Sequence, residues 1–164
     1  MTEKIEKNVI CVVLVAIRRG NDILLLKREN EPLKGYWGLI GGKLKDHEGI
    51  EHAAIREAKE ETGMDVDFIA IRGVLHERLY DEERHKYGLM LFLTECIPKT
   101  FDIQESYEGE VKWFSLKKLE KRKIILSDLW MVNNLLDEKT RVRKVIMREK
   151  NRELFDMKVE EYGD

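Results

Sequence analysis

Hydrophobic positions along the chain fall into short apolar runs separated by charged segments, a pattern typical of buried strands. Val9–Ile17 is a continuous apolar run rich in β-branched residues, and Gly20-Asn21-Asp22 predicts a turn into a second strand at Ile23–Lys27. A short apolar piece, Tyr36–Ile40, follows a polar loop. The charged segment Glu77–Lys86 is interpreted as another loop. Further strands are predicted at Asp65–His76, Tyr87–Ile97 and Val111–Phe114.

Helical periodicity is found in two places. From Ile50 to Thr62 the apolar positions recur at helical spacing, and one candidate buried stripe consists of Ile50, Ala53, Ala54 and Ala58. A second helix is predicted to start at a Ser127 cap and to run to about Asp137. Its predicted inward positions are Leu129, Val132, Leu135 and Leu136. A single helical turn is predicted at Leu116–Leu119.

The order of these elements indicates the fold class. Two final segments, Arg141–Met147 and Leu154–Val159, are predicted to pair as a hairpin around Lys150-Asn151-Arg152. Strands outnumber helices, and one helix lies between strands, so we predict an α+β sandwich around a mixed β-sheet. The length, 164 residues, predicts a single domain over residues 1–164. The pattern does not specify how the strands pair.

Composition narrows the classes of function. Thirty Lys and Arg residues balance 32 Asp and Glu residues, which gives a net charge of −2. This balance argues against a nucleic-acid polymer as partner, and no single-sign run predicts attachment to a membrane surface. Both a monomer and a homodimer are compatible with the sequence.

The two cysteines and the first apolar run bear on the compartment. Cys11 and Cys96 each lie inside an apolar run, which predicts buried free thiols in a reducing compartment. Val9–Ile17 is too short to span a bilayer as a helix, and the polar turn after it is no cleavage site. We therefore expect a cytoplasmic protein.

An acidic cluster closes the first predicted helix. Glu57, Glu60 and Glu61 share one helix face, although like charges at this spacing are mutually destabilising. They also precede Thr62-Gly63, the helix end at which the macrodipole disfavours acids. Hard divalent cations prefer oxygen ligands, and Mg²⁺ uses a few carboxylates together with substrate phosphates. The cluster therefore predicts a metal site shared with a phosphorylated substrate.

The residues before this helix agree with that interpretation. Gly41-Gly42 permits close backbone approach, and Lys43 can hold a phosphate as a point charge. Glu48 lies in the loop that enters the helix and is expected to fold back towards the acids. Arg56 stands four residues before Glu60 and can pair with it.

These residues form a recognisable motif. The stretch GKLKDHEGIEHAAIREAKEETGM, residues 42–64, resembles the Nudix box without a gap: Gly, five residues, Glu, seven residues, Arg-Glu, an aliphatic residue, any residue, Glu-Glu, any residue, Gly and an aliphatic residue. All specified polar and glycine positions agree, and Ala58 fills the first aliphatic position. The sequence thus resembles the Nudix hydrolases.

The resemblance implies a fold, a cofactor and a reaction. It implies an α/β/α sandwich and hydrolysis of a nucleoside diphosphate linked to another group, with Mg²⁺ or Mn²⁺ as cofactor. The implied partner is therefore a small-molecule nucleotide substrate. Water would attack a phosphorus of the diphosphate linkage. The implied metal ligands are Glu57, Glu60, Glu61 and Gly42. Arg56 would orient the glutamates, Glu48 would support the loop or the metal shell, and an extra carboxylate beyond the box is assigned first to Glu108, then to Glu105 and Glu110.

Further features resemble the MutT-type nucleoside triphosphate diphosphatases. The run Trp37–Lys43, Arg28 at the end of the second strand and Trp113-Phe114 match that group, so the implied substrate-binding residues are Arg28, Trp37, Gly41, Gly42, Lys43 and Trp113. Trp37 and Trp113 are each open to core packing or base stacking. Gly38 and Lys117-Lys118 replace the base-reading residues of the oxidised-purine enzymes, so a preference for oxidised guanine does not follow.

Two alternatives stay open beside the triphosphate substrate. Within the enzymes, ADP-ribose or another nucleotide sugar is the second candidate substrate. A non-catalytic module of the same fold, which senses a nucleotide, is the candidate of another class. Such modules commonly lose metal-binding glutamates or add a DNA-binding domain, and this chain keeps every glutamate. Hydrolysis is therefore the favoured prediction.

Overall fold

The computed structural model describes residues 8–104, 106–136 and 141–161. The strands are β1 (Ile10–Arg19), β2 (Asp22–Arg28), β3 (Trp37–Gly38), β4 (Ile40–Lys43), β5 (Val66–Asp81), β6 (Arg84–Pro98), β7 (Gly109–Ser115), β8 (Arg141–Lys150) and β9 (Glu153–Glu161). The helices are α1 (Ile50–Thr62), the 3₁₀ helix η1 (Leu116–Lys121) and α2 (Leu126–Leu135).

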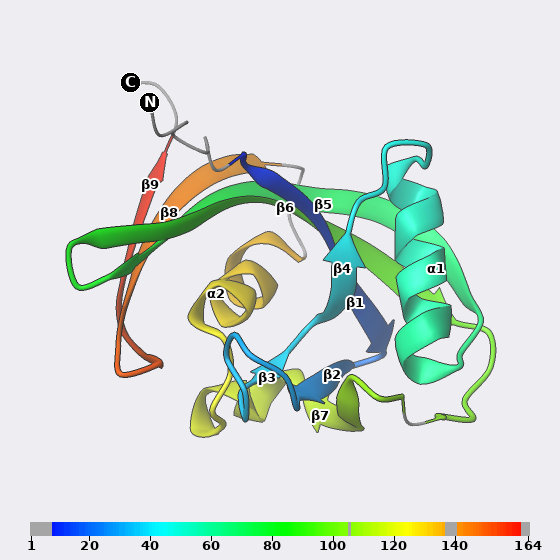
Figure 1. Ribbon diagram of the computed structural model, residues 1–164. Coiled ribbons are helices and arrows are strands. Elements are labelled where there is room, and N and C mark those ends of the chain that lie inside the picture. Colours follow the sequence, from blue (N-terminus) through cyan, green and yellow to red (C-terminus); the bar gives the residue numbers. More distant parts are fainter. Residues whose placement is uncertain (1–7, 105, 137–140, 162–164) are drawn as a thin grey trace.

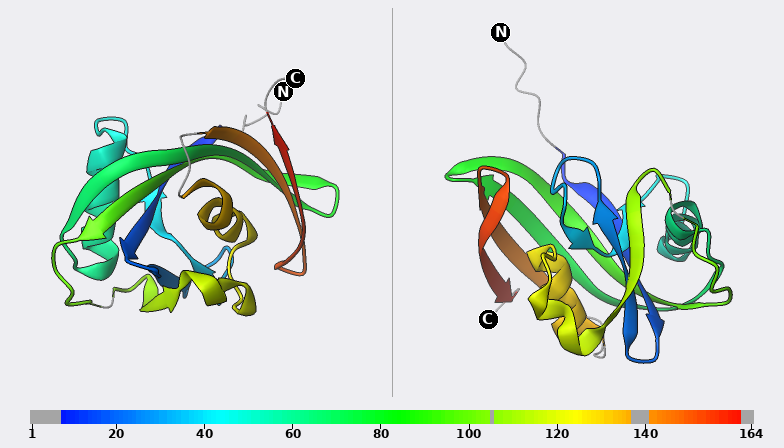
Figure 2. Two further views of the ribbon diagram at one scale, coloured as in Figure 1. Left: turned by 180° about the vertical axis from the view of Figure 1, so that it is seen from behind. Right: turned by 90° about the horizontal axis from the view of Figure 1, so that it is seen from below.

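The strands form a mixed sheet, in the order β3-β2-β1-β6-β5-β8-β9, with β4 on β1 and β7 on β2. The β1–β6 and β5–β8 pairs are parallel, and the other pairs are antiparallel. The sheet is strongly curled: α2 lies in its concave side, and α1 lies beyond β1 and β4 (Figures 1 and 2). The predicted α+β fold with a mixed sheet is confirmed.

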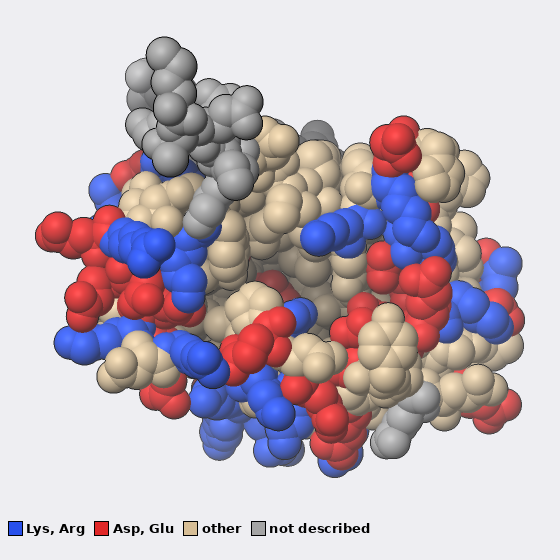
Figure 3. All heavy atoms as spheres, in the orientation of Figure 1, with Lys and Arg blue, Asp and Glu red and all other residues tan. Residues whose placement is uncertain are grey.

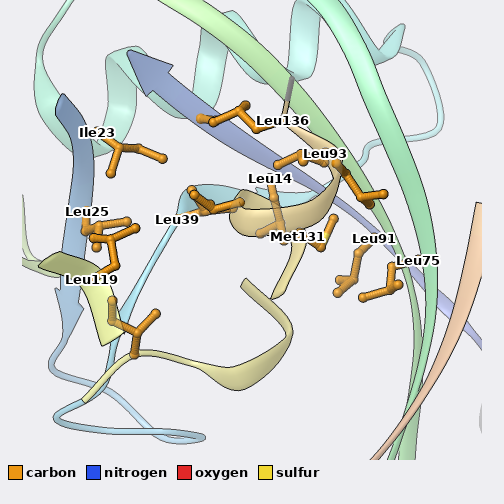
Figure 4. Packing of buried hydrophobic residues seen from close by; sticks show 14 of the residues in the cluster. Leu14, Ile23, Leu25, Leu39, Leu75, Leu91, Leu93, Leu119, Met131 and Leu136 are labelled. Carbon is orange, nitrogen blue, oxygen red and sulfur yellow. The ribbon is translucent and has the colours of Figure 1, made fainter. Parts of the chain in front are cut away.

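Strand β1 is buried on both faces, which explains its continuous apolar run. Val13, Val15 and Ile17 join the hydrophobic cluster beneath α1. Leu14 and Ala16 point the opposite way into the larger cluster around α2, part of which is drawn in Figure 4. The strand thus separates the two hydrophobic cores, and successive residues along it pack into alternate cores.

Helix α1 has the predicted boundaries. Ala53, Ala54 and Ala58 are buried against β1 and β4, whereas Ile50 is only partly buried. Small side chains on this face let the helix approach the sheet closely. Glu57 and Glu61 are buried on the same helix face, so the close packing places their carboxylates next to the β4 backbone.

The prediction of a charged loop at Glu77–Lys86 is wrong. These residues continue β5 and begin β6, and only Glu82-Glu83 forms the turn. Strand β5 pairs with β6 on one side and with β8 on the other, which gives the charged segment regular backbone hydrogen bonds. Glu77 and Leu79 are buried at alternate positions, so the strand period is present. A glutamate at an inward position concealed it.

The predicted Ser127 cap is also wrong. The capping position is Ile125, and Ser127 is buried inside the first turn of α2. The helix ends at Leu135, and the predicted end near Asp137 lies outside the described residues. The predicted terminal hairpin is confirmed, because β8 and β9 pair around Asn151 and Arg152, which both have positive φ.

Both cysteines are free thiols, with Cys96 buried and Cys11 partly buried. Burial raises the pKa of the Cys96 thiol to about 12. A thiol held in its neutral form is a poor nucleophile, so Cys96 acts as a core residue.

Candidate active site

The acidic end of α1 is closed by a defined C-terminal turn. Gly63 adopts a left-handed conformation with φ 73°, and its N–H donates to the carbonyl oxygen of Lys59 at 3.0 Å. The Thr62 hydroxyl donates to the carbonyl of Ala58 and accepts the N–H of Met64. The helix therefore stops directly after Glu60 and Glu61, which fixes where their side chains project.

The double glycine of β4 brings backbone against two of these glutamates. A Cβ at Gly42 would lie 2.5 Å from Glu57 Oε1, and one at Gly41 would lie 2.2 Å from the carbonyl oxygen of Val13. The N–H of Gly41 donates to Glu61 Oε2 at 3.2 Å. A Cβ at Gly42 would displace the Glu57 carboxylate, and one at Gly41 would clash with the β1 backbone, so glycine at position 42 is what allows Glu57 to approach the strand.

Arg56 connects the acids of the site. Its Nη1 donates to Glu57 Oε1 at 2.6 Å and to Glu60 Oε2 at 3.0 Å. Its Nε and Nη2 bind both oxygens of Glu48 at 2.9 and 2.6 Å, and Nη2 also reaches the carbonyl of Lys43 at 3.3 Å. One guanidinium thus fixes two helix glutamates, the entry loop and the end of β4.

Glu48 anchors the loop and does not line the cavity described below. Besides its two bonds to Arg56, it accepts the N–H of Lys45 at 3.0 Å. The hydrogen bonds from Arg56 and Lys45 lower the pKa of Glu48 to about 2. It is therefore a permanent anion that holds the loop, the first of the two roles expected from the sequence.

Two of the helix glutamates lie where a negative charge is costly. Burial raises the pKa of Glu61 to about 8, and repulsion from Glu57 and Glu108 adds to the shift. Burial is also the main cause of the raised pKa of Glu57, although Arg56 opposes it. The site therefore carries more negative charge than Arg56 and the backbone compensate.

These glutamates open into a cavity of about 840 Å³ that extends from α1 to α2. The space-filling view shows a hollow on this face, with walls of largely uncharged residues and with acidic and basic groups on its rim (Figure 3). Gly41, Gly42, Lys43, Glu57, Glu60 and Glu61 line its α1 side. The volume is within the range of small-ligand pockets, and concave apolar walls with a few polar groups are typical of them.

The extra carboxylate proposed from the sequence reaches the same cavity. Glu108 lines it and lies close enough to raise the pKa of Glu61. Tyr107 also lines the cavity, and the neighbouring Glu108 carboxylate raises the pKa of its hydroxyl. Glu110 pairs instead with Lys112 on β7, and Glu105 lies outside the described residues. Among the described candidates, Glu108 is the one placed beside the helix acids.

The predicted substrate-binding residues divide into two groups. Arg28 and Lys43 line the cavity, and the Arg28 Nε donates to the carbonyl of Pro32 at 2.9 Å. Trp37 packs edge-on against Phe114, with ring centroids 4.7 Å apart, and Trp113 lies beneath the guanidinium of Arg19. Neither tryptophan lines the cavity, so their contacts in the structure are packing contacts.

Sequence reasoning missed the polar residues on the α2 side of the cavity, which are Glu77, Tyr87, Ser127 and Asp128. The Asp128 Oδ2 accepts the N–H of Leu39 at 2.8 Å, which ties α2 to the chain just before the double glycine. One signal was available: Glu77 stands between Leu75 and Leu79 at the buried period of a strand. An acid at such a position predicts either a buried partner or a ligand.

The α1 side has the donors that a divalent cation requires. In the part of the chain that the structure describes, no three acidic, histidine or cysteine side chains are arranged as a formed metal site. Glu57 and Glu60 instead face Arg56. The donors are nevertheless all oxygens, and two of them belong to carboxylates with raised pKa values that a cation would stabilise. This donor set suits Mg²⁺ or Mn²⁺ better than a softer metal.

Fold and site together define the family. The family model of the NUDIX domain matches residues 7–131, most of the chain. The chain belongs to the Nudix family. This confirms the resemblance inferred from the box.

Among relatives, an ADP-ribose pyrophosphatase of Methanocaldococcus jannaschii is 33% identical over 105 residues, which are 64% of this chain and 61% of the relative. A putative 8-oxo-dGTP diphosphatase of Bacillus subtilis is 35% identical over 74 residues, or 45% of this chain and 48% of the relative. The chain thus spans less than two thirds of the length of these relatives.

Solved structures agree on the fold. A MutT protein from Bacillus halodurans superposes with a TM-score of 0.75 at 22% identity and covers 93% of this chain and 98% of its own. An ADP-ribose pyrophosphatase from Streptococcus suis gives a TM-score of 0.62 at 21% identity, with 82% and 99% covered. In the described segments, every helix is too short or too polar to cross a membrane.

Proposed function

We propose that this protein hydrolyses phosphoanhydride bonds in nucleoside diphosphate derivatives, and that its preferred reaction converts a (deoxy)nucleoside triphosphate to the monophosphate and pyrophosphate. The observation that carries the proposal is the convergence of Glu57, Glu60, Glu61 and Glu108 beside a cavity large enough for a nucleotide. Lys43 and Arg28 line the same cavity and can hold phosphate oxygens.

Glu57, Glu60 and Glu61, with the backbone of Gly42, would hold Mg²⁺ or Mn²⁺. The cation would neutralise charge on the phosphate oxygens and lower the pKa of the attacking water. In the reaction, a water oxygen bonds to a phosphorus of the anhydride, the bridging P–O bond breaks, and pyrophosphate leaves. The water's proton passes to a carboxylate of this acidic group.

The chain's own residues supply positioning for this chemistry. Arg56 holds Glu57 and Glu60 at fixed distances, and the Gly41 N–H holds Glu61. Glu108 approaches from the loop before β7, outside the box helix. Such fixed geometry lowers the reorganisation needed at the transition state. Apolar walls exclude water from the rest of the substrate.

ADP-ribose, or another nucleotide sugar, is the second candidate substrate. The 33% identity to the M. jannaschii ADP-ribose pyrophosphatase favours it. The run Trp37–Lys43 and the B. subtilis relative named as a putative 8-oxo-dGTP diphosphatase favour the triphosphate. We further propose a role in a cytoplasmic nucleotide pool, with no nucleic-acid polymer as substrate.

A substrate panel tests the proposal. The purified protein is incubated with Mg²⁺ and canonical or oxidised nucleoside triphosphates, ADP-ribose and sugar nucleotides, with Glu60→Gln as control. We expect release of pyrophosphate from triphosphates. Release of two monophosphates from ADP-ribose, with triphosphates untouched, would select the second candidate. No cleavage of any compound would support the nucleotide-sensing alternative.

A further inference from the structure

The α2 side of the cavity contains two buried carboxylates that the hydrolytic chemistry does not use. Glu77 projects from β5 with 3% of its surface exposed, and Asp128 projects from α2 with 5% exposed. Both line the cavity, yet no ion pair joins either one to a described residue. Asp128 accepts the Leu39 N–H, but a buried carboxylate without a balancing cation is destabilising, so a structural role alone does not account for both acids.

Glu77 and Asp128 both have raised pKa values. Burial raises the pKa of Glu77 to about 7, and the charge of Asp128 adds to the shift. Burial likewise raises the pKa of Asp128 to about 6, against the Leu39 N–H and attraction from Arg28. Each acid therefore lies where a hydrogen-bond donor from a ligand would be strongly stabilising.

A third polar group at this side lacks a partner. Ser127 is 1% exposed, and its hydroxyl oxygen makes no hydrogen bond of normal distance and angle to any described residue. Ser127 lies near enough to both acids to lower their pKa values. A buried hydroxyl on a cavity wall, without a full hydrogen bond, indicates a place that a ligand completes.

The walls around these groups suit a flat, largely apolar ring. Leu39, Leu89, Leu91 and Ile125 line the cavity near the acids, and Tyr87 adds an aromatic face. Phosphates would be repelled by Glu77 and Asp128, whereas Lys43 and the helix acids with their cation would attract them. The two sides of the cavity are therefore suited to opposite ends of a nucleotide.

We propose that Glu77 and Asp128, assisted by Ser127, read the base of the substrate and select bases whose hydrogen-bonding edge presents N–H donors side by side, with guanine first. This inference rests on the proposed function, because it takes the cavity's ligand to be a nucleotide. Guanine offers a ring N–H next to an exocyclic amino group, and one carboxylate accepts both. Uracil and thymine place carbonyl oxygens beside a single N–H and would face the acids acceptor to acceptor.

Discrimination between bases is strong when the binding site itself presents hydrogen-bonding groups to the base. A good bidentate contact discriminates by about 1–3 kcal/mol, or roughly 5–150-fold. A site built to hydrogen-bond a substrate also rejects analogues that leave its groups unpaired. We therefore expect guanosine monophosphate to bind at least ~10-fold more tightly than uridine monophosphate.

Binding of the two monophosphates, measured calorimetrically without added metal, tests the proposal independently of catalysis. Glu77→Gln should reduce the ratio of the two affinities at least ~5-fold, because an amide presents one donor where the carboxylate accepts. The matched control is Glu149→Gln, a buried acid of β8 that pairs with Lys86 and does not line the cavity. It should leave the ratio unchanged. Asp128→Asn replaces Glu77→Gln if that variant does not fold.

The proposal is overturned if the wild-type protein binds both monophosphates equally or binds neither. It is also overturned if the variant loses both affinities in equal proportion, which would indicate a purely structural role. Triphosphate hydrolysis without any base preference would contradict the inference and leave the proposed function intact. Selective binding of guanosine monophosphate with no hydrolysis of any triphosphate would sustain the inference and contradict the proposed function.

Discussion

Both sides of the cavity carry carboxylates, but the carboxylates of the two sides lie in different environments. On the α1 side, Glu57 and Glu60 share the guanidinium of Arg56, and Glu57 lies beside the Gly42 backbone. On the α2 side, Glu77 and Asp128 have no paired cation in the described chain. The comparison shows that acids in one cavity lie in different environments, and we expect these environments to suit different ligands.

The difference follows from what surrounds each group. The α1 acids have many oxygens in a small volume, with lysine and arginine at the same side of the cavity, and under the proposed function another cation would complete them. The α2 acids are embedded among leucines, where a neutral ring with N–H groups is a better partner than a hydrated ion. Substitutions that alter one side of the cavity and leave the other intact test whether the two sides have separate roles.

The largest effect is expected on the α1 side. Glu60→Gln or Glu61→Gln should lower kcat by more than ~100-fold, because losses of supporting residues around a metal already cost ~10–100-fold. Folding should be unaffected, since Glu60 is exposed and the amide oxygen introduced by Glu61→Gln can still accept the Gly41 N–H. Steady-state kinetics and circular dichroism measure both. Glu51→Gln, an exposed change on the same helix, is the control; turnover near the wild-type rate in both variants would refute the assignment.

A smaller loss is expected from the glycine that supports this side. Gly42→Ala should reduce kcat/KM by roughly 10–100-fold, because the new Cβ would displace the Glu57 carboxylate. Gly88→Ala on β6 serves as the control, since its Cβ would meet only ordinary contacts at 3.7 Å. If both variants keep full activity, close approach of Glu57 to β4 is not required.

The buried acid Glu77 on the α2 side should affect how the free energy of unfolding depends on pH. The native pKa of Glu77, about 7, lies above its ordinary value of 4.5, so the native state binds the proton more tightly than the unfolded chain. Wild-type stability should therefore fall as pH rises from about 4.5 to 7. Glu77→Gln should lack the share of this loss that Glu77 contributes and be ~1–3 kcal/mol more stable than wild type at pH 8.

Urea unfolding at pH 4 and pH 8 checks this expectation. The advantage of the variant should vanish at pH 4, where the carboxyl is protonated in both states. Glu110→Gln is the control of opposite sign, because Lys112 lowers the pKa of Glu110. If the difference in unfolding free energy between wild type and Glu77→Gln does not depend on pH, the pKa of Glu77 is not raised in the native state.

The smallest effect is that of the cation alone. Mg²⁺ at ten times its dissociation constant should stabilise the native state by about 1.4 kcal/mol and raise Tm by a few degrees. Glu61→Gln should show a smaller shift, and Glu77→Gln should show the wild-type shift. Equal shifts in wild type and Glu61→Gln would place the ion elsewhere.

The same contrast explains what the sequence could predict. The α1 side is encoded within one contiguous stretch, so the helix Ile50–Thr62 and the spacing of its acids were readable without any knowledge of strand pairing. Gly63 and Thr62 specify the helix end locally. The terminal hairpin was likewise readable from its local turn residues.

The α2 side depends on contacts between residues distant in sequence. Glu77 and Asp128 meet only because β5 curls around α2, and strand pairing was not specified by the pattern. The glutamate at an inward position also concealed the strand, and Ser127 was interpreted as a cap because its burial depends on tertiary packing. Trp37 and Trp113 resembled ligand-binding residues by motif, whereas their neighbours Phe114 and Arg19 place them in packing contacts.

The most direct test is a crystal structure of the protein with Mg²⁺ and a non-hydrolysable guanosine triphosphate analogue. We expect metal density on Glu57, Glu60 and Glu61, phosphates beside Lys43, and the guanine edge against Glu77 and Asp128. A nucleotide bound outside this cavity, with no metal at the three glutamates, would contradict the division of the site on which the other conclusions rest.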